Sequence, residues 1–197
     1  MKRSIFIFSL VLGFCWSCNE GKIASPKPYS YPRIEFPEKS YRPFSQPFCL
    51  VAFEGPTITE FNRKRQFFNE DPANECWFNL LYDDLNATLY FTSHDIDRNQ
   101  TLDKLVDDAY LMASKHNDKA NSRQESFIEN RHGLKGVIFE IGGPVASPLQ
   151  FYLTDGTHNF IRGSLYYNSG AANDSLAMVT DYIKEDIDHI VGTARFH

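Results

Sequence analysis

The order of the apolar segments constrains the fold of this chain more than any other feature. Strand-like apolar runs occupy 48–53, 76–82 and 87–93, and a helical stripe with period 3.6 follows from Leu102 to Ala113. Two predicted hairpins come next, at 126–141 and 149–167, the second with Asp155-Gly156 at its turn. A second helical stripe runs from Leu176 to Ile190. Thr101 and Asp174 stand where caps of the two helices are expected.

This order predicts an α+β domain. Strands that follow one another through short turns pair antiparallel, and two amphipathic helices need a sheet face to cover. We therefore expect an antiparallel sheet with both helices packed on one face. The order is similar to the fold shared by the PsbP and Mog1 proteins, a likeness of topology that carries no function by itself.

The N-terminus has the pattern of a lipoprotein signal. Lys2 and Arg3 precede an apolar run from Ile5 to Phe14, which is typical of a secretory signal and shorter than the roughly 20 residues that span a bilayer. Ser17-Cys18 places a small residue before a cysteine, so Cys18 is the predicted lipid attachment site. Acylation of Cys15 would place bulky Phe14 at the cleavage site. An ordinary cleaved signal and an uncleaved apolar anchor stay open as alternatives.

These features predict three parts: a signal peptide at 1–17, a lipidated proline-rich tether at 18–47, and a single α+β globular domain at 48–197. Six of the ten prolines lie in the tether, which favours extended chain. Aromatic residues alternate with these prolines, so part of the tether is expected to pack on the domain. They are Tyr29, Tyr31, Phe36, Tyr41 and Phe44.

Charge and cysteine content narrow the function further. The formal net charge is −5, and it falls to −7 once 1–17 are removed with their two basic residues, which disfavours nucleic acid as a partner. Two cysteines, Cys49 and Cys76, are left after those of the signal and the lipid site. In an oxidising compartment they are predicted to form a disulfide, and two buried free thiols are the alternative. Neither cysteine has the spacing of a metal ligand.

No motif predicts catalysis, a metal or a cofactor. The segment from Asp95 begins like a calcium-binding loop, but Gln100 and Val106 replace the glycine and glutamate that such a loop needs. Ser147 has no serine-nucleophile context, since Pro148 follows it. Asp174-Ser175-Leu176 fits a short O-glycosylation pattern at Ser175, and a plain helix cap is the alternative.

Taken together, the chain resembles the GldD family of gliding motility lipoproteins of Bacteroidetes. The resemblance extends from the signal to the last helix and rests on the order and spacing of several stretches. These are 37–41, Cys49 with 76–79, 105–109, 115–120, 142–147, 150–155, 160–168, 173–176 and 184–187.

The resemblance implies a role in gliding motility and in the linked type IX secretion system. Members are regarded as accessory lipoproteins of that envelope apparatus with no known enzymatic activity. The implied partners are other envelope proteins of the apparatus, with the membrane contacted through the lipid. The implied location is periplasm-facing, on the inner or the outer membrane.

Three functional hypotheses follow. The first is a non-catalytic module that binds another envelope protein, with the tether aromatics as candidate contacts. The second is a periplasmic lipoprotein that binds a small ligand or glycan in a cleft lined by Tyr152, Tyr166 and Tyr167. The third is a hydrolase that uses His94 with Asp95 or Asp97, for which a solvated loop is the simpler interpretation.

Overall fold

The computed structural model describes residues 35–62, 76–115, 119–169 and 176–197. The first half of this region contains β1 (Tyr41–Ser45), β2 (Val51–Pro56), β3 (Glu60–Asn62), β4 (Trp77–Tyr82), the short 3-10 helix η2 (Asp83–Leu85) and β5 (Ala87–Asp95). The second half contains α2 (Leu102–Ser114), β6 (Ser122–Glu129), β7 (Lys135–Gly142), β8 (Leu149–Thr154), β9 (Asn159–Tyr167), α3 (Ala177–Thr193) and β10 (Arg195–Phe196).

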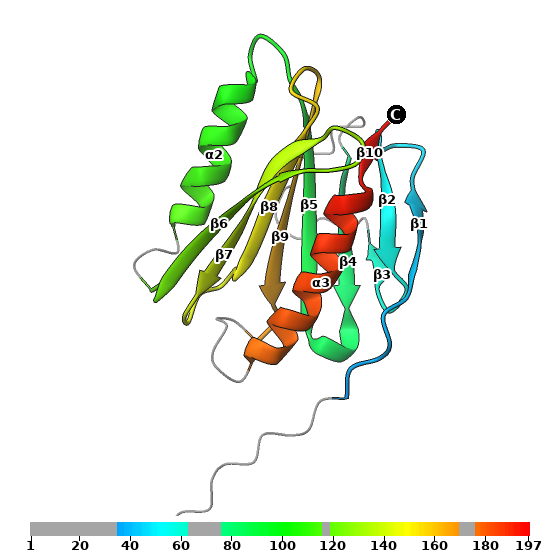
Figure 1. Ribbon diagram of the computed structural model, residues 1–197, viewed down its shortest axis with the longest axis vertical. Coiled ribbons are helices and arrows are strands. Elements are labelled where there is room, and N and C mark those ends of the chain that lie inside the picture. The colour runs from blue at the N-terminus through cyan, green and yellow to red at the C-terminus, as the bar shows by residue number, and fades with distance from the viewer. Residues whose placement is uncertain (1–34, 63–75, 116–118, 170–175) are drawn as a thin grey trace, which may run out of the picture. The chain divides into compact units, whose positions relative to one another are not determined.

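Two antiparallel sheets are built from these strands (Figure 1). The large sheet has the order β3-β4-β5-β9-β8-β7-β6, and β5 pairs with β9 along its whole length, from Ala87 opposite Tyr167 to Asp95 opposite Asn159. The small sheet has the order β1-β2-β10, which places the C-terminal strand beside β2. Strands, helices and antiparallel pairing together confirm the predicted α+β class.

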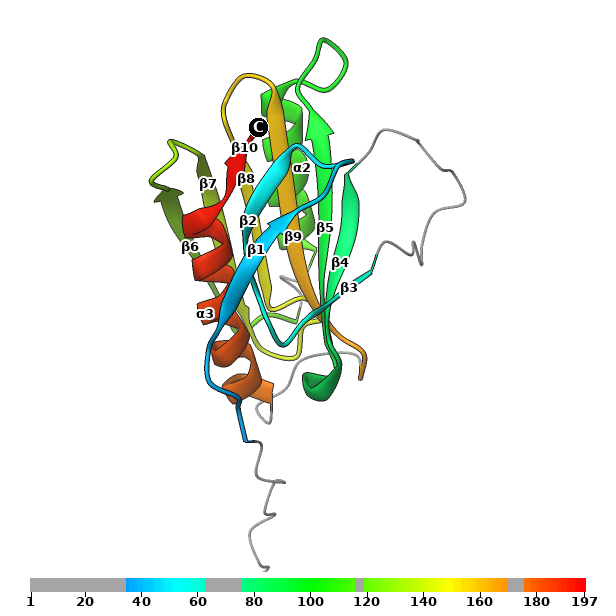
Figure 2. The ribbon, with the colours of Figure 1, turned by 90° about the vertical axis from the view of Figure 1, so that its right-hand side faces the viewer.

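The two helices lie on opposite faces of the large sheet, so the prediction of one shared face was wrong. Side chains alternate between faces along a strand. In β7, Ile138 belongs to the core beneath α3, whereas Val137 and Phe139 pack with Leu105 and Ala109 of α2. Both views show α3 beside the small sheet, and Figure 1 shows α2 near the β6 side of the large sheet (Figures 1 and 2). Each face of the seven-stranded sheet therefore has its own apolar cluster, one beneath α3 and one beneath α2.

The compact unit starts earlier than predicted, since it extends from residue 34 to 197 and includes residues that were assigned to the tether. β1 forms within that segment, where Phe44 stacks on Phe53 with ring centroids 4.5 Å apart and on Phe78 at 4.8 Å. Pro43 sits in β1 opposite Glu54. A proline has no N–H to donate, and β1 tolerates one because it is an edge strand with a partner on one side only.

Local chemistry explains the turns and helix ends. Asn86 ends η2 in the left-handed conformation (φ 51°), which asparagine adopts more readily than most residues. Thr101 occupies the N-cap of α2 without a side-chain hydrogen bond, and its carbonyl accepts from Leu105 N. The described N-cap of α3 is Leu176, while the predicted cap Asp174 lies outside the described residues.

Among the helices that the structure describes, none has the length and apolar character to span a bilayer.

Candidate functional site

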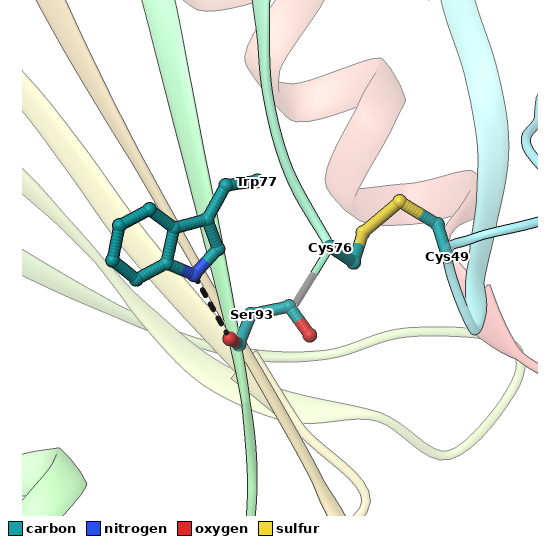
Figure 3. Close-up of a disulfide and its surroundings, with 4 residues drawn as sticks. All are labelled: Cys49, Cys76, Trp77 and Ser93. Carbon is teal, nitrogen blue, oxygen red and sulfur yellow. Dashed lines mark hydrogen bonds between the residues drawn. A yellow bond between two sulfur atoms is a disulfide. The ribbon is translucent and has the colours of Figure 1, made fainter. Parts of the chain in front are cut away.

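A disulfide joins the two sheets. Cys49 lies just before β2 and Cys76 just before β4, and their sulfurs are bonded at 1.99 Å with the Cα atoms 4.8 Å apart (Figure 3). The bond closes a loop of 27 residues, which corresponds to about 3.5 kcal/mol of stabilisation by the chain-entropy estimate. Beside it, Trp77 Nε1 donates to the Ser93 carbonyl at 3.3 Å, which holds the indole against β5.

The residues predicted for the hydrolase hypothesis have separate roles. His94 lies near the end of β5, half-buried, with its ring edge-on to Trp77 at 6.2 Å between centroids. The Asp97 carboxylate instead accepts the backbone N–H groups of Gln100 at 2.7 Å and Asn99 at 2.6 Å, and these bonds lower its pKa. Within the described ranges, no group of three His, Cys, Asp or Glu side chains gathers where it could hold a metal ion.

The three tyrosines of the ligand-binding hypothesis do not line one cleft. Tyr152 is buried beneath α2 and stacks on Phe160 at 5.2 Å between centroids. Tyr166 is half-buried on the same face. Tyr167 belongs to the core on the opposite face, where its hydroxyl pairs with Thr180 Oγ1 at 2.6 Å.

Several predicted residues lie outside the described residues. They are Cys18, the predicted lipid site, Ser175, the predicted glycosylation site, and the tether aromatics Tyr29 and Tyr31. Of the other tether aromatics, Phe44 enters the main core, and Phe36 and Tyr41 contact α3.

The last two take part in a cluster that we call the N-terminal clamp: Phe36, Lys39 and Tyr41 from the N-terminal segment, and Tyr182, Asp186 and His189 from α3. At its centre is Asp186, whose side chain is 0% exposed. Lys39 Nζ lies 2.7 Å from Asp186 Oδ1, and the Tyr41 hydroxyl donates to the same oxygen at 3.1 Å. Lys39 Nζ also donates to the Tyr182 carbonyl at 2.5 Å. A buried carboxylate is thereby paired with a cation and hydrogen-bonded, as burial of a charge requires.

Stacked rings close the clamp on both sides of this ion pair. Phe36 stacks on Tyr182 with centroids 4.7 Å apart, and Tyr41 stacks on His189 at 3.6 Å. Lys39 Nζ lies 3.2 Å from the centroid of the Tyr182 ring, a cation–π geometry. The backbone takes part as well, since the Tyr182 hydroxyl donates to the Pro37 carbonyl at 3.1 Å.

Burial and the Asp186 charge act together on the neighbouring phenols. Burial, followed by the nearby Asp186 carboxylate, raises the pKa of Tyr82 well above its ordinary value, and raises that of Tyr41 in the same way. Tyr82 Oη and Asp186 Oδ2 are both buried, and among the described residues neither atom has a hydrogen bond of standard geometry. Both phenols therefore stay neutral, and that of Tyr41 donates a hydrogen bond to the carboxylate.

Asp186 was not predicted to be a buried charge, although its position in the sequence indicates one. It lies three residues after Ile183 and four before Ile190, which places it on the apolar stripe of the helix. A carboxylate at a stripe position predicts a buried charge with a cationic partner. The partner, 147 residues away, leaves no local trace in the sequence.

A second surface lies on the α2 side of the large sheet, where α2 packs on β7, β8 and the start of β9. Beyond this helix lie β4, β5 and part of β9 (Figure 1). Half-buried side chains of these strands line the same face of the sheet. We call this surface the open half-face; it is formed by Trp77, Leu81, Tyr90 and Tyr166. Tyr90 and Tyr166 meet edge to face at 5.6 Å between centroids.

The comparison with protein families identifies the chain. The family model for the gliding motility lipoprotein GldD matches residues 21–196. The chain belongs to the GldD family of gliding motility lipoproteins. Membership implies a role in gliding motility and association with the cell envelope. Two stretches that carried the resemblance in the sequence, 37–41 and 184–187, meet in the N-terminal clamp.

Other comparisons add little. No match was found among curated proteins. Among solved structures, the solution structure of cyanobacterial PsbP (CyanoP) from Synechocystis sp. PCC 6803 is similar, with a TM-score of 0.48 and 12% sequence identity. The match covers 90% of this chain and 100% of that one.

Proposed function

We propose that this protein is a lipid-anchored, non-catalytic component of the cell envelope of a Bacteroidetes bacterium. It is held on the periplasmic side of a membrane through Cys18, is required for gliding motility and the linked type IX secretion, and acts by binding other envelope proteins of that apparatus. Membership of the GldD family carries the proposal, because the family match begins three residues after Cys18 and extends to residue 196.

The open half-face is the contact surface that we propose. Tyrosine and tryptophan are enriched in the core of protein interfaces because they bury a large area at a small cost in side-chain entropy. Trp77 is fixed by its hydrogen bond to Ser93, and Tyr90 is supported by Tyr166, so both rings are held in place before a partner binds. Preorganised aromatic side chains of this kind favour affinity.

The anchor is tested by deleting the gene in its host and measuring colony spreading and the proteins released into the medium. We expect both to be lost, and to be restored by the wild-type gene but not by the Cys18→Ala variant at a matched protein level. Normal spreading and a normal set of secreted proteins in the deletion strain would refute the assigned process. Full rescue by Cys18→Ala would refute the anchor alone.

The contact surface is tested separately. Tyr90→Ala and Tyr166→Ala remove half-buried rings of the open half-face, whereas Glu185→Ala changes an exposed side chain of α3 and serves as the control. We expect the tyrosine variants to remain at wild-type abundance in the membrane fraction and to lose spreading. A photo-crosslinking residue at position 90 should then capture an envelope protein that the same residue at 185 does not. Undiminished spreading of both tyrosine variants would exclude this face as the contact surface.

A further inference from the structure

A cleft of about 280 Å³ separates α2 from β5 and β9, on the same side of the large sheet as the open half-face. This volume is near the lower limit of about 300 Å³ for small-molecule pockets. Charged and polar side chains line it from three elements: Lys104 and Asp108 on α2, His94 on β5 and Arg162 on β9. Leu105, Ala109 and Phe160 provide an apolar wall.

The surroundings of Arg162 indicate a binding site for a negatively charged group. Its guanidinium is half-buried, and no ion pair to a carboxylate joins it within the part of the chain that the structure describes. Nη2 donates to Ser164 Oγ at 3.2 Å and Nη1 contacts the Met112 sulfur, while Nε is enclosed and has no hydrogen-bond partner among the described residues. A thioether is a weak acceptor, so the charge is poorly compensated. Burial accordingly lowers the pKa of Arg162, although Tyr166 and Asp108 act in the opposite direction.

The charges around the cleft limit what it can bind. Arg162 and Lys104 are positive and Asp108 is negative, so these three side chains together carry one net positive charge. Lys104 is exposed at the rim, where its Nζ donates to the Asn99 carbonyl at 3.1 Å and remains able to bond to other groups. A single negative charge matches this lining better than a phosphate dianion does.

We propose that this cleft binds the carboxylate of a small monoanionic ligand with a short apolar body. The planar guanidinium of Arg162 receives the carboxylate, Lys104 contributes charge from the rim, and the wall of Leu105, Ala109 and Phe160 takes the apolar part. Met112, partly exposed beside the guanidinium, moves aside as the ligand enters. The site is separate from the protein contact proposed above and does not depend on it.

The test uses the purified full chain in detergent, labelled with 15N, and follows the backbone N–H signals of Leu105 and Ala109, which line the cleft and are present in every variant, during titration with sodium butyrate. We expect a saturable shift of these signals in the wild-type protein. Arg162→Gln should raise the dissociation constant at least about tenfold, and Lys104→Gln should raise it by a smaller factor. Asp108→Asn should tighten binding about two- to fivefold, because it removes the opposing charge. Asp107→Asn is the matched control, since Asp107 is exposed on α2 but does not line the cleft.

Further probes define the ligand. A short peptide with a free C-terminal carboxylate is compared with its C-terminal amide. Binding of butyrate supports a small acid as the ligand, whereas binding of the free peptide acid without binding of butyrate would overturn that assignment. Absence of a saturable shift with every carboxylate, preferential binding of inorganic phosphate, or unchanged affinity in Asp108→Asn would overturn it. If Arg162→Gln fails to fold, Lys104→Gln and Asp108→Asn decide, because both residues are exposed.

Discussion

Replacement of Lys39 by methionine tests the central contact of the N-terminal clamp. The methionine keeps most of the apolar length of the side chain but removes the charge, which leaves Asp186, 0% exposed, without its cation. Breaking a buried ion pair from one side costs about 3–5 kcal/mol. The Tyr41 hydroxyl still donates to Asp186 Oδ1, so we expect a loss near the lower limit, about 3 kcal/mol.

The assay is equilibrium unfolding in urea at pH 7 with the purified full chain. Lys135→Met is the control because Lys135 is exposed, and it should change the unfolding free energy by less than about 0.5 kcal/mol. The double variant Lys39→Met with Asp186→Asn removes both charges while it keeps an acceptor for Tyr41, so its cost should fall to about 1–2 kcal/mol.

The double variant decides whether the reasoning holds. If an unpaired buried charge causes the loss, removing the second charge recovers stability, and the two substitutions are strongly non-additive. A loss below about 1 kcal/mol in Lys39→Met, or a double variant as unstable as the sum of the single ones, would show that Asp186 does not depend on Lys39.

Three further predictions concern the rest of the domain. Cys49→Ser should lower the unfolding free energy by about 3.5 kcal/mol, and dithiothreitol should reproduce this loss in the wild-type protein but cause no further loss in the variant. Gly136→Ala should lower the unfolding free energy by about 3 kcal/mol, because the new Cβ would overlap the Tyr152 carbonyl. At Gly192 in α3 a new Cβ would meet no described atom within 4 Å, so Gly192→Ala should raise the unfolding free energy by about 0.5–1 kcal/mol. Urea unfolding midpoints measure both changes. The raised pKa of Tyr82 means that its stabilisation is present below about pH 10 and is lost as pH rises toward the folded pKa, by up to about 1.4 kcal/mol per pH unit. Tyr82→Phe should remove that part of the alkaline slope, and an unchanged slope would contradict the assignment.

The sequence predicted those elements whose pattern is local. Strands β8 and β9 have the predicted bounds, 149–154 and 159–167, because the Asp155-Gly156 turn separates two uninterrupted apolar runs. At this turn the Asp155 carboxylate accepts backbone N–H groups from Thr157 and His158, both at 2.8 Å. Burial by itself would raise the pKa of Asp155, but these hydrogen bonds outweigh it and hold the pKa well below its usual range. A turn of this kind is encoded by adjacent residues and can be recognised from them.

Elements that depend on distant partners were not predicted. The first strand was predicted at 48–53, yet β2 continues through Gly55 and Pro56, which lie opposite Arg42 and Tyr41 of β1. β1 itself was hidden by its proline, which an edge strand tolerates, and β10 consists of two residues that pair with β2. The placement of the helices failed for the same reason, because an amphipathic stripe shows that a face is buried but does not say against which side of a sheet.

The N-terminal clamp was harder to predict than the strands, because its contacts join residues that lie far apart in the sequence. A uniformly apolar α3 could bury the same stripe against the core, but it would not specify where residues 35–41 lie. Asp186 supplies that information, since a buried carboxylate is stable only where Lys39 and the neighbouring phenols surround it. An ion pair of this kind contributes little net stability over an apolar contact, but it strongly disfavours every arrangement that leaves one charge alone. The pair therefore fixes the path by which the N-terminal segment joins the domain, a property that only the folded chain displays.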